Sequence, residues 1–344
     1  MAERGRAHPD THSARDQLKR GETEKIRWMD LMRRLGISRV KGTAATGHGS
    51  ACMSFELSRQ EDELALESGV SRRDCLTSVA AAAMGYTLAA GPVRAAAIKT
   101  STEGLASGAA AVPVSGAEMP AYFARPLNTA KPPVILVAME VFGLHEHIKD
   151  VTRRLGLLGA FAVAPDYYFR LGDLTKITEP SQLMPLVNSK PDQELFSDLD
   201  AAVAWAKGQG GDTERLGIIG FCRGGRTVWL YAAHNASLKA GVAFYGSLMD
   251  KPSAAMPKNA FDLATKVKAP VLGLYGAEDT GITPDQVEAM KDKLEAAGKT
   301  AAFKIYPGAG HGFFADYRQS YRADAAEDAW NAMRAWFKKY HVLD

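Results

Sequence analysis

The sequence predicts an α/β fold, a doubly wound and mostly parallel sheet flanked by helices, on three observations. Hydrophobic side chains make up 46% of the 344 residues, enough to fill a sizeable core and to exclude a wholly disordered chain. Short apolar runs recur without alternating polar positions, which indicates strands buried on both faces. Amphipathic segments separate these runs, and strands that alternate with helices favour a parallel sheet.

The expected elements follow in order along the chain. Residues 109–114 and 119–124, split by Ser115-Gly116, predict a β-hairpin. Six apolar runs then predict buried strands: Val134–Ala138, Phe161–Ala164, Leu216–Gly220, Gly241–Tyr245, Val271–Tyr275 and Ala302–Tyr306. Five amphipathic stretches predict helices: His147–Leu158, Phe196–Lys207, Gly225–Asn235, Pro284–Ala297 and Ala323–Tyr340. A long irregular stretch at 170–191, with three prolines, is either a lid over a site or an exposed connection.

Charge and motif content exclude several kinds of partner. The net charge is only +3, from 42 Lys and Arg against 39 Asp and Glu, too small for a nucleic-acid-binding surface. No apolar run reaches the ~18–20 residues of a membrane-spanning helix. The 8 histidines are scattered without the spacing of a zinc site, and no glycine-rich phosphate-binding motif follows a strand. We therefore expect no metal and no cofactor, and the sequence leaves the oligomeric state open.

The residues before 98 indicate an export signal. Arg72-Arg73 precedes a short apolar stretch at 76–90, and Ala95-Ala-Ala97 closes the segment. A charged start, a modest apolar core and an Ala-x-Ala end are typical of a signal peptide, here of the twin-arginine type, with cleavage expected before Ile98. The protein would then meet the twin-arginine export machinery and be periplasmic or secreted. If the segment is instead an Ala-rich surface helix with a chance arginine pair, the protein would be cytoplasmic.

The late position of this signal divides the chain into three parts. A start at Met53 would give the signal an ordinary short leader. Residues 1–52 would then be a disordered or untranslated extension, 53–97 the signal segment, and 98–344 one catalytic domain. N-terminal sequencing of the natural protein that begins within 1–52 would refute the later start.

The chemistry is expected where the strands end, because sites in doubly wound sheets lie at the carboxyl edge. The strand at 216–220 leads into Gly220-Phe-Cys-Arg-Gly-Gly225, the pattern of a nucleophile elbow. Small flanking residues permit the strained turn and let the next helix pass close by. Cys222 would stand at the sheet edge, where the helix N-terminus favours a thiolate. Cys52, Cys75 and Cys222 lie in different contexts, so we expect no disulfide.

An acid and a base follow the last two predicted strands. Asp279 comes soon after the first of them, and His311, flanked by glycines, follows the second. The chain order Cys222, Asp279, His311 is the nucleophile–acid–base order of α/β-hydrolases. The imidazole could take the thiol proton while the carboxylate orients the ring. The alternatives are a loop-capping Asp279, with Glu278 as a rival acid, and a purely structural His311.

Glu140 follows the first buried run, at the same edge of the sheet. A carboxylate there would adjust the protonation of Cys222; alternatively it only pairs with a nearby arginine. The N–H of Val141 would join the N–H of Arg223 as an oxyanion hole, because both amides point toward one sheet edge.

Together these motifs resemble the dienelactone hydrolase family over about 107–340. They are Met139-Glu-Val-Phe-Gly143 with His147-Ile-Lys-Asp150, Ala164-Pro-Asp-Tyr-Tyr168, Gly220–Gly225 and Gly310-His-Gly-Phe-Phe314. The resemblance implies an α/β-hydrolase fold and a Cys–His–Asp triad that cleaves a cyclic enol ester, 4-carboxymethylenebut-2-en-4-olide, to maleylacetate in aromatic degradation. It also implies that Glu140 swings between the thiol and an arginine when substrate binds, and that Arg170 holds the substrate carboxylate. The signal segment resembles that of an exported branch of the family.

Two positions depart from the family pattern and bear on the substrate. A second carboxylate-binding arginine, expected shortly after the histidine, is replaced near Ala315, and Arg318 is only a loose substitute. The residue after the nucleophile is usually bulky and apolar, but here it is Arg223. Its side chain either contacts an anion or points into solvent.

The mechanism expected from these residues is hydrolysis of a lactone or ester. The Cys222 thiolate attacks the carbonyl, and water then hydrolyses the thioester. A general carboxylesterase or thioesterase of the same fold would use the same residues. A third reading is a binding protein without catalysis, which an incomplete triad would mark; here all three members are present.

Overall fold

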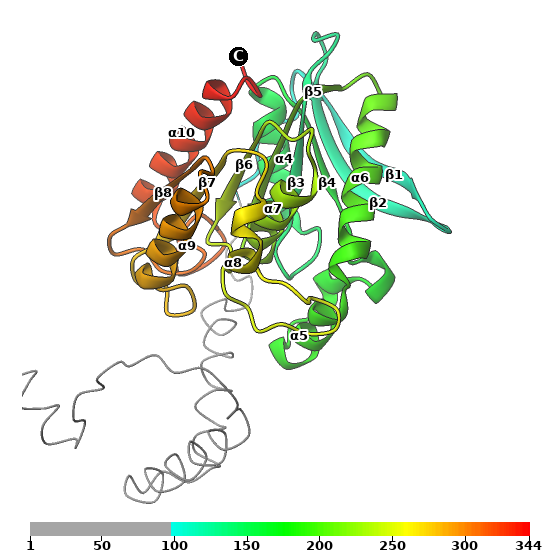
Figure 1. Ribbon diagram of the computed structural model, residues 1–344. Helices are drawn as coiled ribbons and strands as arrows, with labels where there is room; N and C mark the ends of the chain where they lie inside the picture. The colour runs from blue at the N-terminus through cyan, green and yellow to red at the C-terminus, as the bar shows by residue number, and fades with distance from the viewer. Residues whose placement is uncertain (1–97) are drawn as a thin grey trace, which may run out of the picture. The chain divides into compact units, whose positions relative to one another are not determined.

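The computed structural model describes residues 98–344, which form one eight-stranded sheet between two layers of helices (Figure 1). The strand order is β1-β2-β4-β3-β5-β6-β7-β8. β1 (Leu105–Val114) and β2 (Ala117–Pro126) form the expected antiparallel hairpin, and β2 also pairs antiparallel with β4. All other neighbours are parallel. The predicted fold class is confirmed.

The six predicted buried strands are present in the sheet. They are β3 (Pro133–Ala138), β4 (Phe161–Pro165), β5 (Asp212–Phe221), β6 (Ala240–Phe244), β7 (Val271–Gly276) and β8 (Ala301–Tyr306). β3, β4, β6 and β7 are buried along their whole length, which explains why their sequences are apolar without alternation. β8 lies at the edge of the sheet and is only partly buried.

The five predicted helices cover both faces of the sheet (Figure 1). α4 (Glu146–Leu157) and α10 (Ala323–Lys339) lie on one face, and α6 (Asp192–Gly208), α7 (Arg223–His234) and α9 (Pro284–Ala296) lie on the other. Short pieces complete the fold: α8 (Ala260–Leu263) and the 3₁₀ turn Ala264–Lys266. This arrangement leaves the carboxyl ends of the parallel strands at one edge.

The stretch at 170–191 is not irregular, which corrects the expectation from sequence. It contains 3₁₀ turns at Phe169–Leu171 and Leu174–Lys176 and the helix α5 (Pro180–Ser189). Pro180 occupies the first turn of α5, where a missing N–H is harmless and the fixed φ suits a helix. A second proline, Pro185, lies inside α5. These prolines explain why no helix was predicted at 180–189.

The signal segment and the extension before it lie outside the described residues, as do Cys52 and Cys75. Within 98–344, no helix has both the length and the apolar character needed to cross a bilayer.

Candidate active site

The turn between β5 and α7 presents Cys222 at the carboxyl edge of the sheet. Cys222 adopts φ 55° and ψ −116°, a backbone conformation that residues other than glycine rarely adopt. The following helix packs so tightly that only glycine fits beside it. A Cβ on Gly224 would lie 2.0 Å from the carbonyl oxygen of Ala138, and one on Gly225 would lie 2.6 Å from the Cα of Gly246. The strained turn is therefore held by the sheet beneath it.

The loops after β7 and β8 bring Asp279 and His311 together. Nδ1 of His311 lies 2.7 Å from Oδ2 of Asp279, and both side chains are buried. The other oxygen of Asp279 accepts the backbone N–H groups of Gly281 and Ile282 at 2.9 and 3.0 Å. These bonds aim the carboxylate at the ring. Glu278, the rival acid, is exposed.

The thiol and the imidazole perturb each other. Burial alone would raise the pKa of Cys222, but the positive charge of His311 and a hydrogen bond between the two side chains lower it. Burial alone would lower the pKa of His311, but the charge of Cys222 and the hydrogen bond to Asp279 raise it to about 9. These directions describe a thiolate paired with an imidazolium, which is the reactive form of a cysteine nucleophile.

Glu140, just beyond β3, is fully buried and bound by three donors. Nη2 of Arg318 donates to Oε1 at 2.9 Å, and Oε2 accepts the hydroxyl of Tyr317 and faces Nε2 of His145 at 3.1 Å. Burial would raise the pKa of Glu140, but the Arg318 charge and the His145 hydrogen bond hold it well below its usual value. Arg318 thus lies at the site, whereas Ala315 is a buried apolar residue.

Tyr317 and His145 were not predicted as site residues. Both lie close in sequence to residues that it singled out: His145 follows Glu140 by 5 positions, and Tyr317 precedes Arg318. Neither residue belongs to a motif that predicts its role, so only the fold shows that both contact the carboxylate of Glu140.

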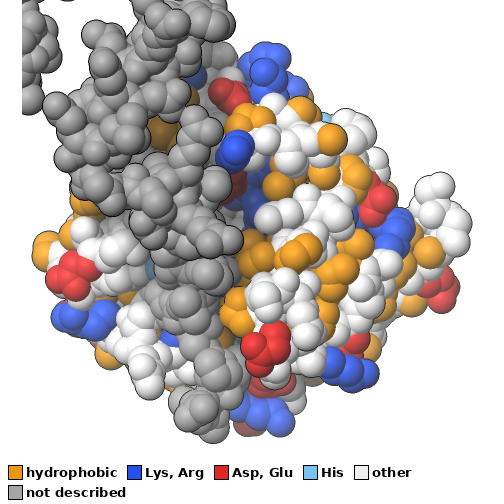
Figure 2. Space-filling view, turned by 90° about the horizontal axis from the view of Figure 1, so that it is seen from below, with side chains coloured by type: hydrophobic (Ala, Val, Ile, Leu, Met, Phe, Trp, Pro, Cys, Tyr) orange, Lys and Arg blue, Asp and Glu red, His pale blue; other side chains and the backbone are white. Residues whose placement is uncertain are grey.

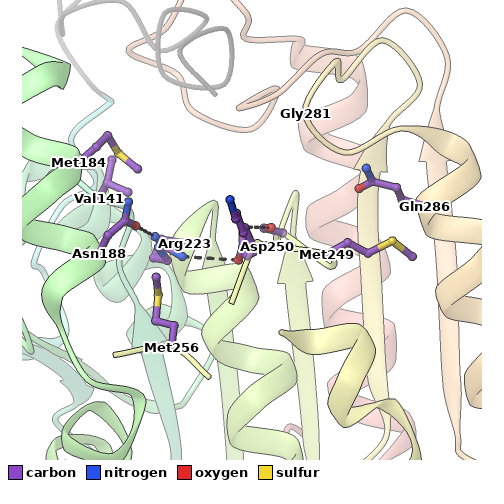
Figure 3. A pocket seen from close by; sticks show the side chains of 11 residues that line it. Val141, Met184, Asn188, Arg223, Met249, Asp250, Met256, Gly281 and Gln286 are labelled. Carbon is purple, nitrogen blue, oxygen red and sulfur yellow. Dashed lines mark hydrogen bonds and ion pairs between the residues drawn. The ribbon is translucent and has the colours of Figure 1, made fainter. Parts of the chain in front are cut away.

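A cavity of about 320 Å³ opens next to the elbow. Its lining residues are Val141, Met184, Asn188, Arg223, Ser247, Met249, Asp250, Lys251, Met256, Gly281 and Gln286. The Arg223 side chain lies between two walls of the cavity (Figure 3): it donates to Asn188 of α5 and lies 3.5 Å from Asp250 in the loop after β6. The stretch at 170–191 therefore supplies part of the cavity wall through α5.

Hydrophobic side chains also gather on the surface at this end of the domain. Figure 2, the view from below Figure 1, shows them grouped between scattered charges. Met249, which lines the cavity, is 37% exposed.

The predicted oxyanion donors lie beside this cavity. Val141 follows Glu140 at the end of β3, and Arg223 is the first residue of α7, where helix N–H groups have no partner within the helix. Both residues line the cavity. The proposed role of their amides stays a prediction.

Arg170 is engaged elsewhere. Its Nη1 lies 2.9 Å from Oδ2 of Asp198 and 3.1 Å from Oε1 of Glu194, and its guanidinium stacks over the Phe169 ring. Arg170 is not among the residues that line the cavity. Its expected contact with a substrate carboxylate stays a prediction.

Among residues 98–344, no group of three or more His, Cys, Asp or Glu side chains is arranged to hold a metal ion.

Known proteins match this chain over most of its length. The model of the dienelactone hydrolase family matches residues 119–341. A Methylorubrum extorquens protein, provisionally named carboxymethylenebutenolidase, is 51% identical over 282 residues, 81% of this chain and 96% of its own. An Escherichia coli K12 protein with the same provisional name is 47% identical over 258 residues, 74% of this chain and 95% of its own.

A solved structure agrees with these sequence matches. A crystal structure from Klebsiella pneumoniae, provisionally described as a dienelactone hydrolase, is 48% identical and superposes with a TM-score of 0.67. The match covers 69% of this chain and 99% of the Klebsiella chain.

Proposed function

Because the chain belongs to the dienelactone hydrolase family, we propose that it hydrolyses a lactone or ester through Cys222 as the nucleophile. Membership of this family supports a hydrolase that acts on ester or lactone bonds. The observation that supports the cysteine mechanism is the geometry of the elbow. Cys222 is presented in a strained turn and hydrogen bonded to His311, which is itself held at 2.7 Å by Asp279.

The proposed reaction has two half-reactions. His311 takes the thiol proton, and the thiolate sulfur attacks the carbonyl carbon to form a tetrahedral intermediate. Collapse of the intermediate forms a thioester, and the ring or ester oxygen leaves with the proton that His311 returns. Water then attacks the thioester, giving its proton to His311, and the second collapse releases the acid and restores the thiol. Asp279 orients the imidazole and stabilises its charged form throughout.

The proposed oxyanion hole consists of the N–H groups of Val141 and Arg223. Two preorganised donors at the developing oxyanion would stabilise the negative charge that forms in the transition state. Arg223 lies at the start of α7, so the positive end of the helix dipole would also favour the negative oxygen.

The substrate class separates two versions of this proposal. The provisional names of the relatives point to the dienelactone, an anionic lactone, and Arg223 and Lys251 in the cavity wall suit an anion. Three methionines, Met184, Met249 and Met256, suit the apolar part of a neutral ester and favour a general carboxylesterase. A panel of anionic lactones, short aryl esters and thioesters distinguishes the two.

Replacement of the sulfur tests the chemistry itself. We expect Cys222→Ala to abolish hydrolysis of every substrate that the wild-type protein cleaves, because no other nucleophile lies at the elbow. Unchanged hydrolysis by Cys222→Ala would overturn the thiol mechanism.

We also propose that the chain is exported through its twin-arginine segment. The support is the sequence pattern at 72–97. N-terminal sequencing of protein from a periplasmic or culture fraction should give Ile98 as the first residue. Recovery of the uncleaved chain only in the cytoplasm would contradict export.

A further inference from the structure

We propose that Tyr317 and His145 are positioning residues that lock Glu140 onto Arg318, so that Cys222 passes its proton to His311 in the free enzyme, before substrate binds. This inference rests on the proposed function of Cys222. It differs from the expectation raised by family resemblance, in which the carboxylate swings to the thiol when substrate arrives. In this chain the carboxylate would be fixed and the thiol permanently activated by the imidazole.

Both oxygens of Glu140 are occupied. Oε1 accepts Nη2 of Arg318 at 2.9 Å, while Oε2 accepts the Tyr317 hydroxyl and the His145 ring nitrogen. Nε of Arg318 lies 3.2 Å from the same Tyr317 hydroxyl, so the tyrosine links the cation to the carboxylate. A carboxylate that swung to Cys222 would leave two buried donors, on Arg318 and Tyr317, and the partly buried His145 without their acceptor, which is strongly unfavourable.

The side chains that hold Glu140 are themselves packed in place. The Tyr317 ring lies edge-on to His145 at 5.1 Å and to His147 at 5.3 Å between ring centroids. The Arg318 guanidinium lies over the Phe142 ring at 5.1 Å. These contacts leave the donors little freedom to follow a moving carboxylate.

The donors stay in their donating form over a wide pH range. Burial lowers the pKa of His145, which keeps its ring neutral with one N–H for Glu140. Burial also raises the pKa of Tyr317 well above its usual value, so its hydroxyl keeps its proton. The lock is therefore not opened by a modest change of pH.

The His311 ring, hydrogen bonded to the thiol, is the acceptor that we propose for its proton. The Sγ–H bond breaks and an Nε2–H bond forms on His311, with Asp279 balancing the new positive charge across a 2.7 Å contact. The titratable and charged groups that face Cys222 or Glu140 are His311, Glu140, Arg318, Tyr317, Tyr245, Tyr168, His145 and His147, and Asp279 contacts His311.

Titration of the wild-type thiol without substrate is the first test. Cys222 of the full chain is alkylated with iodoacetamide between about pH 5 and 9, and its peptide is quantified by mass spectrometry, which separates it from Cys52 and Cys75. We expect an apparent pKa clearly below the ~8.5 of an ordinary thiol. Thiolate absorbance near 240 nm, with Cys222→Ala as the blank, should report the same transition. An ordinary thiol pKa overturns the proposal.

Removal of the two donors is the second test. In Tyr317→Phe combined with His145→Phe, Glu140 is freed to approach the sulfur, so its charge should raise the apparent pKa of Cys222 by about one unit. The acid limb of kcat/KM should move up with it, with about a tenfold loss near pH 6 and little loss near pH 9. Tyr317→Phe combined with His145→Gln, which keeps one donor, should bring the apparent pKa of Cys222 part of the way back to the wild-type value.

Matched controls remove donors from carboxylates outside the site. Tyr306 donates to Asp328 at 2.9 Å and His234 contacts Asp200 at 2.8 Å, so Tyr306→Phe and His234→Phe should leave the thiol titration unchanged. A folded double variant with a wild-type alkylation profile overturns the lock, and if the variant does not fold, the wild-type titration decides. Full hydrolysis by Cys222→Ala would instead refute the proposed function, so the two failures are distinguishable.

Discussion

Arg318 donates to Glu140 at 2.9 Å across 178 positions of sequence, and both side chains are buried beside the proposed nucleophile. The pair joins the segment after His311 to the end of β3. It therefore ties two loops of the site to each other as well as setting the charge near the thiol.

Loss of this arginine should be costly to stability. Arg318→Met leaves the Glu140 carboxylate buried without a cation, and breaking a buried pair in this way costs about 3–5 kcal/mol. Urea unfolding at neutral pH measures the loss. Arg322→Met, which removes an arginine that is about half exposed, should cost less than about 1 kcal/mol.

The same pair gives a sign for the pH dependence of stability. The pKa of Glu140 is held below its usual value, so the stabilisation is present above the ordinary glutamate pKa of 4.5 and is lost as pH falls below it. The difference in unfolding free energy between wild type and Glu140→Gln combined with Arg318→Met should shrink as pH falls from about 6 to 4. A difference that grows over this range would contradict the assignment.

Proton transfer through His311 should set the alkaline limit of activity. The pKa of His311 is raised to about 9, so the imidazolium that protonates the leaving oxygen persists below that pH and disappears above it. We expect kcat/KM to fall as pH rises through about 9. Stability contributed by this group has the same sign: it is fully present below the unfolded histidine pKa of 6.5 and is lost as pH rises through about 9.

Asp279→Asn should lower the pH at which activity falls on the alkaline side. The hydrogen bond from His311 to the carboxylate helps raise the pKa of the ring, so its loss should shift the alkaline limb of kcat/KM to lower pH and reduce the maximum rate by at least about a hundredfold. Glu278→Gln alters an exposed neighbour and is the control. An identical alkaline limb in wild type and Asp279→Asn would exclude Asp279 as the orienting acid.

Close packing at the elbow makes a sharp structural prediction. Gly224→Ala places a methyl group 2.0 Å from the Ala138 carbonyl oxygen, so either α7 or β3 must move. We expect the free energy of unfolding, measured by heat or urea, to fall by about 1–3 kcal/mol, together with a loss of activity. Gly208→Ala at the end of α6, where nothing lies within 4 Å of the new methyl, should leave both quantities near wild type. Equal stability of the two variants would contradict the tight contact.

The sequence predicted the sheet, and it singled out Cys222, Asp279 and His311 as the proposed triad, because both inferences depend on local signals. Unalternated apolar runs mark strands buried on both faces, and the glycines around Cys222 mark a turn that other residues cannot form. The pairing of Glu140 with an arginine was one of the alternatives from sequence, but its other two donors could not be predicted in this way. His145 and Tyr317 meet only because β3 and β8 deliver their loops to one edge, a relationship that no spacing along the chain encodes. Helix α5 was not predicted because prolines usually mark loops: Pro180 occupies the first turn, where a helix tolerates it, but Pro185 lies inside the helix.

The charge at Arg223 should decide which substrates bind. Its guanidinium lines the cavity, where it also contacts Asn188 and Asp250. The Arg170 guanidinium is not among the cavity-lining groups and is bound to Asp198 and Glu194. We therefore expect Arg223→Met to raise KM for carboxylate-bearing lactones and esters by about tenfold and to change KM for neutral aryl esters little, because a charge-assisted contact is lost only with the anion. Arg223→Lys should keep part of the preference. Arg170→Met is the comparison, with a smaller effect expected on the anionic substrates. If Arg170→Met instead has the larger effect on KM for the anions, the carboxylate is held at the position that family resemblance implies, and the charge at Arg223 serves the cavity wall alone.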